Sequence, residues 1–436
     1  MPDARTDEIV EVLQQNFGEL IEHDPAAFRQ RFRKMANDPF AFYRGSACLF
    51  YNDVAGQDDP WADEASSRVW IHGDLHAENF GTYMDGRGIL VFDVNDFDEA
   101  YLGHWTWDLQ RCSASLALLL WNKAFPDDVI DDVIERYVRA YVDQARYYLD
   151  EDDDHEWALG LHNARGAVLD ALHRARASTR DHLLSAQTVL IDQDRTFDDS
   201  AGVRRLDDDE RDLVLAAFKD YLGTIPESRR LDIEVAYDVK DVVGRSGFGI
   251  GSAGLAAYNV LIEGRSQALE NDVVLSIKQG VEAALERVVD DERISREIQH
   301  HGHRTALSQR ALQVHADPFL GWTQLDDTGF VVTELSPYEA DLEWADVAEP
   351  EEVLELVEDL GRATAKVHCA SDADAGGTLV DEQVERLVID CVGDDVDGLV
   401  EWVREFAVGY ASSTRDDHAK FVEAFRSDAF AAVKAT

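Results

Sequence analysis

The chain has 436 residues, of which 88 are acidic and 41 are basic, so its formal net charge is −47 at pH 7. This length can bury a large core and favours two lobes over one compact domain, and an apolar content of 45% excludes a disordered acidic chain. The charge also argues against binding to nucleic acid, because such binding needs a basic stripe on the surface.

The acidic residues are spread along the whole chain rather than gathered in one tail. A surface of this kind repels itself in ordinary buffer and tolerates compaction best when salt screens it. We therefore interpret the charge as adaptation to high salt, as in halophilic proteins, and not as the signature of a particular ligand.

The sequence contains no segment that predicts export or membrane insertion. The longest apolar runs, such as Ala114–Trp121, are far too short to cross a bilayer, and no apolar stretch follows Met1. The cysteines are far apart and form no CxxC pair, which indicates reduced core residues rather than disulfides or a zinc site: Cys48, Cys112, Cys369 and Cys391. We expect a cytoplasmic protein with no membrane and no nucleic-acid partner; its oligomeric state stays open.

The first half of the chain is mainly helical by its apolar spacing. The expected elements are helices at 7–35, 105–145, 156–192 and 207–223, strands at Val69–Ile71 and Gly88–Phe92, and an Asp/Arg-rich loop at 193–211. The first strand leads into the segment HGDLHAEN, His72–Asn79, and the second leads into Asp93.

The residue pattern changes at the start of the second half, where β-rich runs separated by glycines occupy residues 236–280. The further expected elements are a helix at 281–312, a strand pair at Thr323–Leu325 and Phe330–Leu335, and helices at Glu352–Cys369 and Glu382–Thr414. We predict an α+β fold in which a helical lobe is interrupted by a β-rich lobe. The expected segments are 1–70 (N-terminal helices), 71–235 (helical lobe with the site), 236–344 (β-rich lobe) and 345–436 (helices that complete the helical lobe).

The segment His72–Asn79 has the spacing of a kinase catalytic loop, with an aspartate at Asp74 and an asparagine five residues later at Asn79. Phosphoryl transfer needs a carboxylate beside the attacking hydroxyl and groups that hold magnesium, and these two positions suit those roles. We predict Asp74 as the catalytic base, Asn79 as a metal ligand and His72 as an orienting residue of the catalytic group.

A second acidic segment follows the next strand, in the sequence VFDVNDFDE. Asp93 ends the apolar run fourteen residues after Asn79, a plausible hairpin distance, and is predicted to bind the bridging metal. Asp96 and Asp98 could hold a second metal ion or order the ligands of the first. The alternative for the whole cluster is a polar turn whose side chains cap local backbone groups. A zinc site from His72, Asp74 and His76 is a further alternative, although no HExxH-type motif accompanies it.

The third signal is a glycine-rich segment in the β-rich region, where GIGSAG fits the pattern GxGxxG. Backbone amides of such a loop can approach phosphates because no Cβ intervenes. The residues predicted to bind the nucleotide are Gly247, Gly249, Gly251, Ser252, Gly254 and Lys278. Lys278 ends the strand VVLSI and resembles the lysine of the VAIK motif. A dinucleotide fold would instead make Ser252–Ile262 a helix; we prefer a β-hairpin.

These parts occur in an unusual order, with the catalytic loop at residue 72, the glycines near 249 and the lysine at 278. Joining the two termini restores the ordinary kinase order, and circular permutation leaves packing intact when termini lie close together. The segment Leu360–His368 then precedes HGDLHAEN, as a similar helix does in aminoglycoside and choline kinases. We predict a circularly permuted, two-lobed kinase-like fold.

Taken together, the motifs resemble those of one uncharacterised prokaryotic family, domain of unknown function 2252. The segments that carry the resemblance are DPFAFYRG, HGDLHAENFG, FDVNDFDEA, WTWDLQR, GIGSAG and DPFLGW. HGDLHAEN with VFDVNDFDE also looks like the aminoglycoside phosphotransferase branch of the protein-kinase-like superfamily. That resemblance implies ATP and Mg²⁺ as cofactors, Lys278 as a phosphate-binding residue and Asp108 as a brace of the catalytic loop. The glutamate partner of Lys278 stays open among Glu282, Glu286, Glu292 and Glu297.

The function expected from this reasoning is a Mg-ATP-dependent phosphotransferase acting on an unknown small-molecule or protein hydroxyl. Transfer of AMP in place of phosphate is an open variant. The alternatives are a catalytically silent ATP-binding module of the same fold and a metal-dependent hydrolase that uses His72, Asp74 and His76. Arg44 precedes the catalytic loop and is either an anion-binding residue or a packing arginine.

Overall fold

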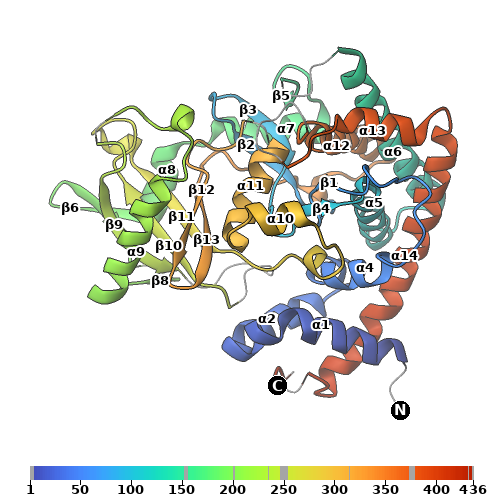
Figure 1. Cartoon of the computed structure of the whole chain (residues 1–436), viewed down its shortest axis with the longest axis horizontal. Coiled ribbons are helices and arrows are strands. Elements are labelled where there is room, and N and C mark those ends of the chain that lie inside the picture. The colour runs from blue at the N-terminus through green and yellow to red at the C-terminus, as the bar shows by residue number, and fades with distance from the viewer. Residues whose placement is uncertain are drawn as a thin grey trace.

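In a computed structural model, the described residues are 4–151, 156–199, 202–233, 235–245, 254–313, 315–372, 379–430 and 432–434. The chain mixes helices with antiparallel strands, which confirms the α+β composition expected from the sequence. Helices make up most of one side of the molecule, and the largest sheet lies at the other (Figure 1). No helix among the described residues is both long enough and apolar enough to cross a membrane.

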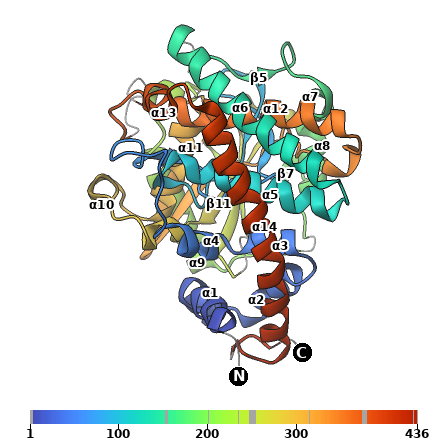
Figure 2. The same cartoon turned by 90° about the vertical axis from the view of Figure 1, so that its right-hand side faces the viewer.

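Most of the helices gather around one large core (Figures 1 and 2). Their bounds are α1 (Ala4–His23), α2 (Pro25–Met35), α3 (Pro39–Gly45), α4 (Ala47–Val54), α5 (Trp105–Asn122), α6 (Asp127–Glu151), α7 (Gly166–Ala177), α8 (Arg180–Gln187), α9 (Asp208–Leu222), α10 (Glu292–Glu297), α11 (His301–Gln313), α12 (Pro350–Cys369), α13 (Val384–Val392) and α14 (Val396–Arg426). Helix α5 is buried over nearly its whole length. Its polar residues therefore need partners inside the protein, and these partners build the site described below.

The strands form several antiparallel sheets. Their bounds are β1 (Val69–Ile71), β2 (Phe80–Met84), β3 (Leu90–Val94), β4 (Tyr101–Gly103), β5 (Leu159–Gly160), β6 (Thr188–Ile191), β7 (Asp194–Phe197), β8 (Val203–Arg204), β9 (Val239–Arg245), β10 (Ala257–Ile262), β11 (Val273–Gln279), β12 (Gly321–Leu325) and β13 (Thr328–Glu334). The largest sheet has six strands in the order β12-β13-β11-β10-β9-β8. Smaller sheets pair β1 with β4, β2 with β3 and β5, and β6 with β7.

The two faces of the six-stranded sheet have different neighbours. Side chains alternate along a strand, so Val273, Leu275 and Ile277 of β11 face the same side, where they pack in a core that includes α9. Ser276 and Lys278 project from the opposite face and line a cavity. Because β10 is a strand and not a helix, its structure agrees with the expected hairpin and not with a dinucleotide-binding helix.

The two chain ends lie side by side. Helix α1 packs against α14, and Arg5 forms an ion pair of 2.6 Å with Asp417. Arg29 of α2 donates a hydrogen bond of 2.9 Å to the carbonyl oxygen of Lys434. The N and C labels accordingly fall close together (Figure 2).

Two expected long helices are broken into shorter ones. The first is interrupted at Asp24, which caps α2 by accepting hydrogen bonds from two backbone amides, with Pro25 at the first helical position. The last expected helix, Glu382–Thr414, is divided after α13, at Gly393. The φ of Gly393 is 54°, a left-handed conformation that favours glycine. Helix α14 then continues well beyond the expected end at Thr414, to Arg426.

The expectation of a helix at 156–192 followed by a loop at 193–211 was wrong in part. Strands β6 and β7 form a hairpin there, and β8 joins the edge of the large sheet. Asp192 and Gln193 both have positive φ, the geometry of the tight turn that matches strand twist. The helix expected at 281–312 is likewise divided, into α10 and α11.

Candidate functional site

The segment HGDLHAEN begins directly after β1 and is held by buried α5. The carboxylate of Asp108 accepts backbone N–H bonds from His72 (2.7 Å) and Gly73 (3.1 Å). The Asp108 carboxylate also lies 3.0 Å from Nε2 of His368, at the end of α12. Burial raises the pKa of Asp108, but His368, His72 and the amide donors outweigh it, so the net shift is downward. Asp108 thus holds the backbone of the loop, the place expected for it from the resemblance to the protein-kinase-like superfamily.

Gly73 is a position that requires glycine. Its φ is +80°, and a Cβ there would come within 2.1 Å of the carbonyl oxygen of Glu99. The loop therefore lies directly against the chain that follows β3, which brings the two acidic segments of the sequence together.

Asp74 is held by Arg111, a residue that sequence reasoning did not single out. Both Nε (2.8 Å) and Nη2 (2.5 Å) of Arg111 donate to Oδ1 of Asp74. The guanidinium is fully buried, lies 4.4 Å from the ring centre of Tyr43 and donates to its carbonyl oxygen. Burial alone would lower the pKa of Arg111, but the charge of Asp74 raises it overall. The one sequence signal was position, because Arg111 lies one helical turn after Asp108.

The two histidines of the loop differ: His72 is hydrogen-bonded to the backbone, and His76 is neutral. Nδ1 of His72 accepts the backbone N–H of Asp74 (3.3 Å), and its Nε2 lies 2.8 Å from the carbonyl oxygen of Asn95. Both ring nitrogens of His72 are therefore engaged by backbone groups. Burial and the positive charges of Arg44 and Arg111 lower the pKa of His76 well below its usual value, so His76 is neutral at pH 7.

Asn79 and Asp93, both predicted as metal ligands, lie in different surroundings. The side-chain amide of Asn79 donates to the carbonyl oxygen of Asp74 (2.8 Å), which leaves its own oxygen available to a cation. Asp93 is almost wholly buried and accepts hydrogen bonds from Nζ of Lys366 (2.5 Å) and from the amide of Val94 (2.9 Å). Burial raises the pKa of Asp93, partly offset by Lys366. Asn79 lines one of the two cavities described below, whereas Asp93 lines neither of them.

Acidic residues that follow β3 line the same cavity as Asp74 and Asn79. Asp96 has a φ of 61°, a left-handed conformation that is uncommon outside glycine and often found at functional positions. Among the described residues, no hydrogen bond or ion pair engages the Asp96 carboxylate. Asp98 forms an ion pair with Lys278, whose pKa is raised by Asp98 and Asp96 against the opposing effect of burial. Carboxylates and an amide oxygen at this point form a donor set suited to Mg²⁺.

The partner of Lys278 was left open among four glutamates, and Asp98 takes that place. Glu286 contacts Arg304 at 3.0 Å, and Glu292 contacts Arg296 at 2.9 Å. Glu282 forms an ion pair with Arg287. The ion pair between Lys278 and Asp98 therefore connects β11 to the acidic segment after β3, although the two residues are 180 positions apart in the sequence.

Two cavities meet at this point, and Asp96 and Asp98 line both. The helix-side cavity, about 470 Å³, is lined by residues of α1–α4, by the segment HGDLHAEN and by residues 279–287; it includes Asp74 and Asn79. The sheet-side cavity, about 320 Å³, is lined by Ser276 and Lys278 of β11 and by residues of β2, β13 and α11. Among the predicted nucleotide-binding residues, Gly247, Gly249, Gly251 and Ser252 lie outside the described residues. Gly254 is described and lies beside Leu20 and Phe28 of the N-terminal helices.

Carboxyl groups crowd one end of the sheet-side cavity. Burial and the neighbouring charge of Glu334 raise the pKa of Asp317 to about 7, and burial with Asp317 and Glu334 raises that of Glu339 to about 8. Glu334 forms an ion pair of 2.5 Å with Arg180. Asp317 and Glu339 are therefore partly protonated near neutrality and could donate as well as accept hydrogen bonds.

These raised pKa values predict a pH dependence of stability. A carboxyl whose pKa is higher in the folded state binds protons more tightly there, so folding stability falls as pH rises from about 4 to about 7. We expect Asp317→Asn to gain stability relative to the unmutated chain over this range, by at most about 1.4 kcal/mol per pH unit. Denaturant melts at fixed high salt between pH 5 and 8 measure the difference. Asp326→Asn, in the β12–β13 turn, is the matched control; parallel curves for Asp317→Asn and the unmutated chain would contradict the expectation.

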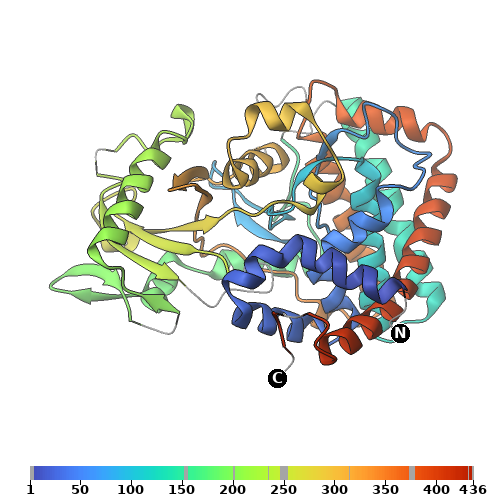
Figure 3. The ribbon, with the colours of Figure 1, turned by 60° about the horizontal axis from the view of Figure 1, so that its bottom comes forward.

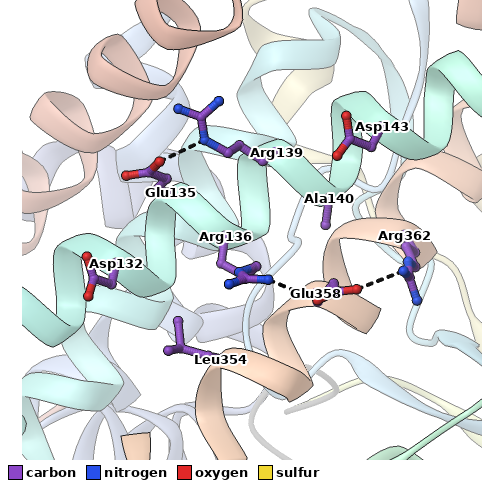
Figure 4. Close-up of a pocket in the computed structure, with 9 residues that line it drawn as sticks. All are labelled: Asp132, Glu135, Arg136, Arg139, Ala140, Asp143, Leu354, Glu358 and Arg362. Carbon is purple, nitrogen blue, oxygen red and sulfur yellow. Dashed lines mark hydrogen bonds and ion pairs between the residues drawn. The ribbon is translucent and has the colours of Figure 1, made fainter. Parts of the chain in front are cut away.

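A third hollow lies elsewhere, between α6 and α12, and its lining residues form ion pairs with one another (Figure 4). Glu358 contacts Arg136 at 3.3 Å and Arg362 at 2.7 Å, and Glu135 contacts Arg139 at 2.7 Å. Solvated ion pairs of this kind are ordinary surface features of a charged protein. It contains none of the predicted site residues.

The structure also bears on the metal-hydrolase alternative. In the part of the chain that is described, no group of three or more histidine, cysteine, aspartate or glutamate residues is arranged to hold a metal ion. His76 lies 3.9 Å from Asp74, and the ring nitrogens of His72 are hydrogen-bonded to the backbone.

Comparison with known proteins identifies the family but no close characterised relative. No curated protein and no solved structure matches the chain. One family model matches residues 23–424, nearly the whole chain, and its description is "Uncharacterized protein conserved in bacteria (DUF2252)". The resemblance seen in the sequence motifs is thereby confirmed, and the chain belongs to the DUF2252 family.

Proposed function

We propose that this chain is a Mg-ATP-dependent phosphotransferase with a kinase-like site. One observation carries the proposal. The catalytic-loop residues Asp74 and Asn79 share a cavity with Asp96 and Asp98, and Asp98 binds the strand lysine Lys278. A carboxylate base, a metal-binding amide, metal-binding carboxylates and a phosphate-binding lysine are the parts that phosphoryl transfer requires.

The proposal assigns a role to each group. Lys278 binds the phosphates of ATP, and Asn79, Asp96 and Asp98 hold the metal, while Asp93 is left as a structural residue. Bound Mg²⁺ would neutralise charge on the β- and γ-phosphates. The acceptor oxygen forms a bond to the γ-phosphorus as the bond to the bridging oxygen breaks, ADP leaves with that electron pair, and the hydroxyl proton passes to Asp74.

The arrangement of the large sheet supports a kinase-like fold. Strands β9 and β10 flank the glycine-rich segment, β11 carries the lysine, α10 and α11 follow, and β12 and β13 complete the sheet. This is the order of parts in the nucleotide lobe of kinases, whose lysine lies on the third strand. The sheet-side cavity beneath β11 and β13 is the proposed adenosine site.

The neighbouring chain ends support the circular permutation. Ion pairs and hydrogen bonds join α1 and α2 to α14 and the last residues, so a single loop could connect the ends without repacking the core. His368, at the end of α12, meets the catalytic loop through the shared carboxylate of Asp108. A helix of this kind precedes the loop in kinases of ordinary order, and here it lies beside it in space.

Replacing Lys278 tests the nucleotide site. We expect Lys278→Met to weaken Mg-ATP binding by about ten- to a hundredfold, because one charge-assisted contact to phosphate contributes about 1.5–3 kcal/mol. Isothermal calorimetry with a non-hydrolysable ATP analogue and Mg²⁺ at high salt measures the affinity. Lys240→Met, which removes a lysine of the same sheet bound to Asp272 (2.6 Å), is the matched control. Equal affinities for the Lys278 variant and the unmutated chain would remove the lysine from the site.

The silent ATP-binding module remains the second candidate. The hydrogen bonds from Arg111 to Asp74 favour this module over the metal-dependent hydrolase. The Oδ1 atom of Asp74 already accepts two hydrogen bonds from this buried cation, so it is engaged before any acceptor hydroxyl binds. ATP binding without ADP release, tested across a broad panel of acceptors, would support the silent module. Failure of any nucleotide to bind would contradict both ATP proposals.

A further inference from the structure

The helix-side cavity holds two polar atoms that lie close together without forming a hydrogen bond. Asp74 and His76 both line this cavity, and Oδ2 of Asp74 lies 3.9 Å from Nε2 of His76. In Figure 3, α1 and α2, two of the helices that contribute to its lining, lie across the front of the molecule. A separation of 3.9 Å is too long for a direct hydrogen bond and is the spacing of two groups that share a polar atom between them.

Arg111 determines which oxygen of Asp74 is turned toward His76. Its buried guanidinium donates two hydrogen bonds to Oδ1 of Asp74. The ring centres of Tyr43 and Phe50 lie 4.4 and 5.2 Å from this guanidinium, so it is enclosed and has little room to turn. Among the described residues, no hydrogen bond engages Oδ2 of Asp74. Oδ2 is therefore the oxygen that is available to accept a proton from a bound molecule.

His76 has a donor on the nitrogen nearest to Oδ2. The residue is 3% exposed, and its ring meets that of Phe40 edge-on, with 6.3 Å between the ring centres. Nδ1 of His76 accepts the backbone N–H of Glu78 at 3.3 Å, and the ring is neutral, so its one proton is on Nε2. An N–H donor and a carboxylate acceptor thus lie 3.9 Å apart in the wall of the cavity.

We infer that His76 binds the acceptor hydroxyl together with Asp74: the hydroxyl oxygen accepts the Nε2–H of His76, and its proton faces Oδ2 of Asp74. An oxygen at ordinary hydrogen-bond distances from the two atoms, about 2.9 and 2.7 Å, would have them about 90° apart. A hydroxyl oxygen has two lone pairs, so one remains to attack phosphorus. The inference rests on the proposed phosphotransferase function and adds to it the residue that orients the acceptor.

The inferred contact leaves the balance of the transfer unchanged. The hydroxyl oxygen forms its bond to the γ-phosphorus as the bond to the bridging oxygen breaks, and ADP leaves with that electron pair. The hydroxyl proton passes to Oδ2 of Asp74, while His76 keeps its own proton because it donates only a hydrogen bond. Holding the oxygen at two points aligns it for attack, and this recognition applies to any hydroxyl, whatever the charge of the rest of the acceptor.

Two substitutions at position 76 separate this role from a purely structural one. Counted in bonds from Cβ, the amide nitrogen of glutamine is as far as Nε2 of histidine, and the amide oxygen of asparagine is as far as Nδ1. His76→Asn can therefore keep the hydrogen bond from the N–H of Glu78, as in an Asx turn, but loses the donor to the hydroxyl. His76→Gln keeps the donor and loses the bond from Glu78.

The measurement is ADP release from Mg-ATP at high salt with water, the simplest hydroxyl, as the acceptor. We expect His76→Asn to lower kcat by about tenfold or more and His76→Gln to stay within about threefold of the unmutated chain, because only asparagine loses the donor. The KM for ATP should change less than about twofold in both, since His76 is not a proposed phosphate-binding residue. Equal kcat values for the two variants, or a lower kcat for His76→Gln, would overturn the inference.

Folding and the parent proposal are controlled separately. Circular dichroism melts show whether each variant is folded; if only one is, a tenfold loss in His76→Gln or an unchanged kcat in His76→Asn overturns the inference by itself. His303 is the matched control, because its Nδ1 also accepts a backbone N–H, from Gln299 at 3.3 Å, yet it lines neither cavity. His303→Asn and His303→Gln should leave kcat unchanged.

The proposed function fails in a different way from the inference. An unmutated chain that binds no Mg-ATP would overturn the proposed function, and one that binds Mg-ATP without releasing ADP would support the silent module; the inference falls in both cases. Equal rates of the His76→Asn and His76→Gln variants, in a chain that releases ADP, would overturn the inference alone.

Discussion

Replacing Asp74 with asparagine is expected to lower ADP release by about 10²- to 10⁴-fold, the range that a positioned general base contributes. Asparagine keeps the side-chain oxygen that accepts the hydrogen bonds from Arg111, so the loop should remain in place. The affinity for Mg-ATP should change less than threefold, because Asp74 is not among the proposed phosphate or metal groups. Steady-state ADP release and calorimetry on the same preparation measure the two quantities.

The control for this prediction is Asp326→Asn, which removes one carboxylate from the exposed β12–β13 turn and should leave both quantities unchanged. Full activity of Asp74→Asn would remove the base assignment. Loss of ATP binding together with activity would show that the residue holds the nucleotide site together. Only retained binding with lost turnover agrees with the proposed role.

Replacing Lys366 with methionine is expected to lower the free energy of unfolding by about 3–5 kcal/mol, because it leaves the carboxylate of Asp93 buried without its cation. The pair is well enclosed, with side chains only 5% and 2% exposed. Lys366 also donates a hydrogen bond to the carbonyl oxygen of Leu312, so the variant loses this bond between α12 and α11 as well. Urea melts at fixed high salt measure the loss.

The double variant Asp93→Asn with Lys366→Met separates the two roles considered for Asp93. Removing both charges should restore part of the lost stability, since no ion is then left buried without a partner. Asp93→Asn alone should leave the dissociation constant for Mg²⁺ in the ATP complex within twofold. A tenfold weaker Mg²⁺ affinity in that variant would return Asp93 to the metal site.

Local patterns in the sequence predicted much of the site because they report on backbone geometry over short distances. The spacing from His72 to Asn79 lies within one loop, and Asp108, expected to brace that loop, accepts its backbone N–H groups. The strand that ends in Lys278 was expected from its apolar run, and β11 has nearly those bounds. The mixed α and β composition and the family assignment followed from the same local signals.

The groups that face one another were decided by tertiary structure. Asp93 and Asp98 are chemically equivalent in VFDVNDFDE, but Asp93 lies on β3 with its side chain in the core, where Lys366 arrives from 273 positions further along the chain. Asp98 lies beyond the strand and reaches Lys278 instead. No local pattern records which distant cation a carboxylate will meet.

The sequence by itself determined a large acidic α+β protein, its family and the loop that carries Asp74 and Asn79. Only the tertiary structure decided that Arg111 contacts Asp74, that Asp98 pairs with Lys278 and that residues of α1–α4 line the cavity that contains Asp74. The physical reason is range: helix spacing, turns and caps depend on neighbours a few residues away, whereas burial and ion pairing depend on segments that meet only after the chain has packed.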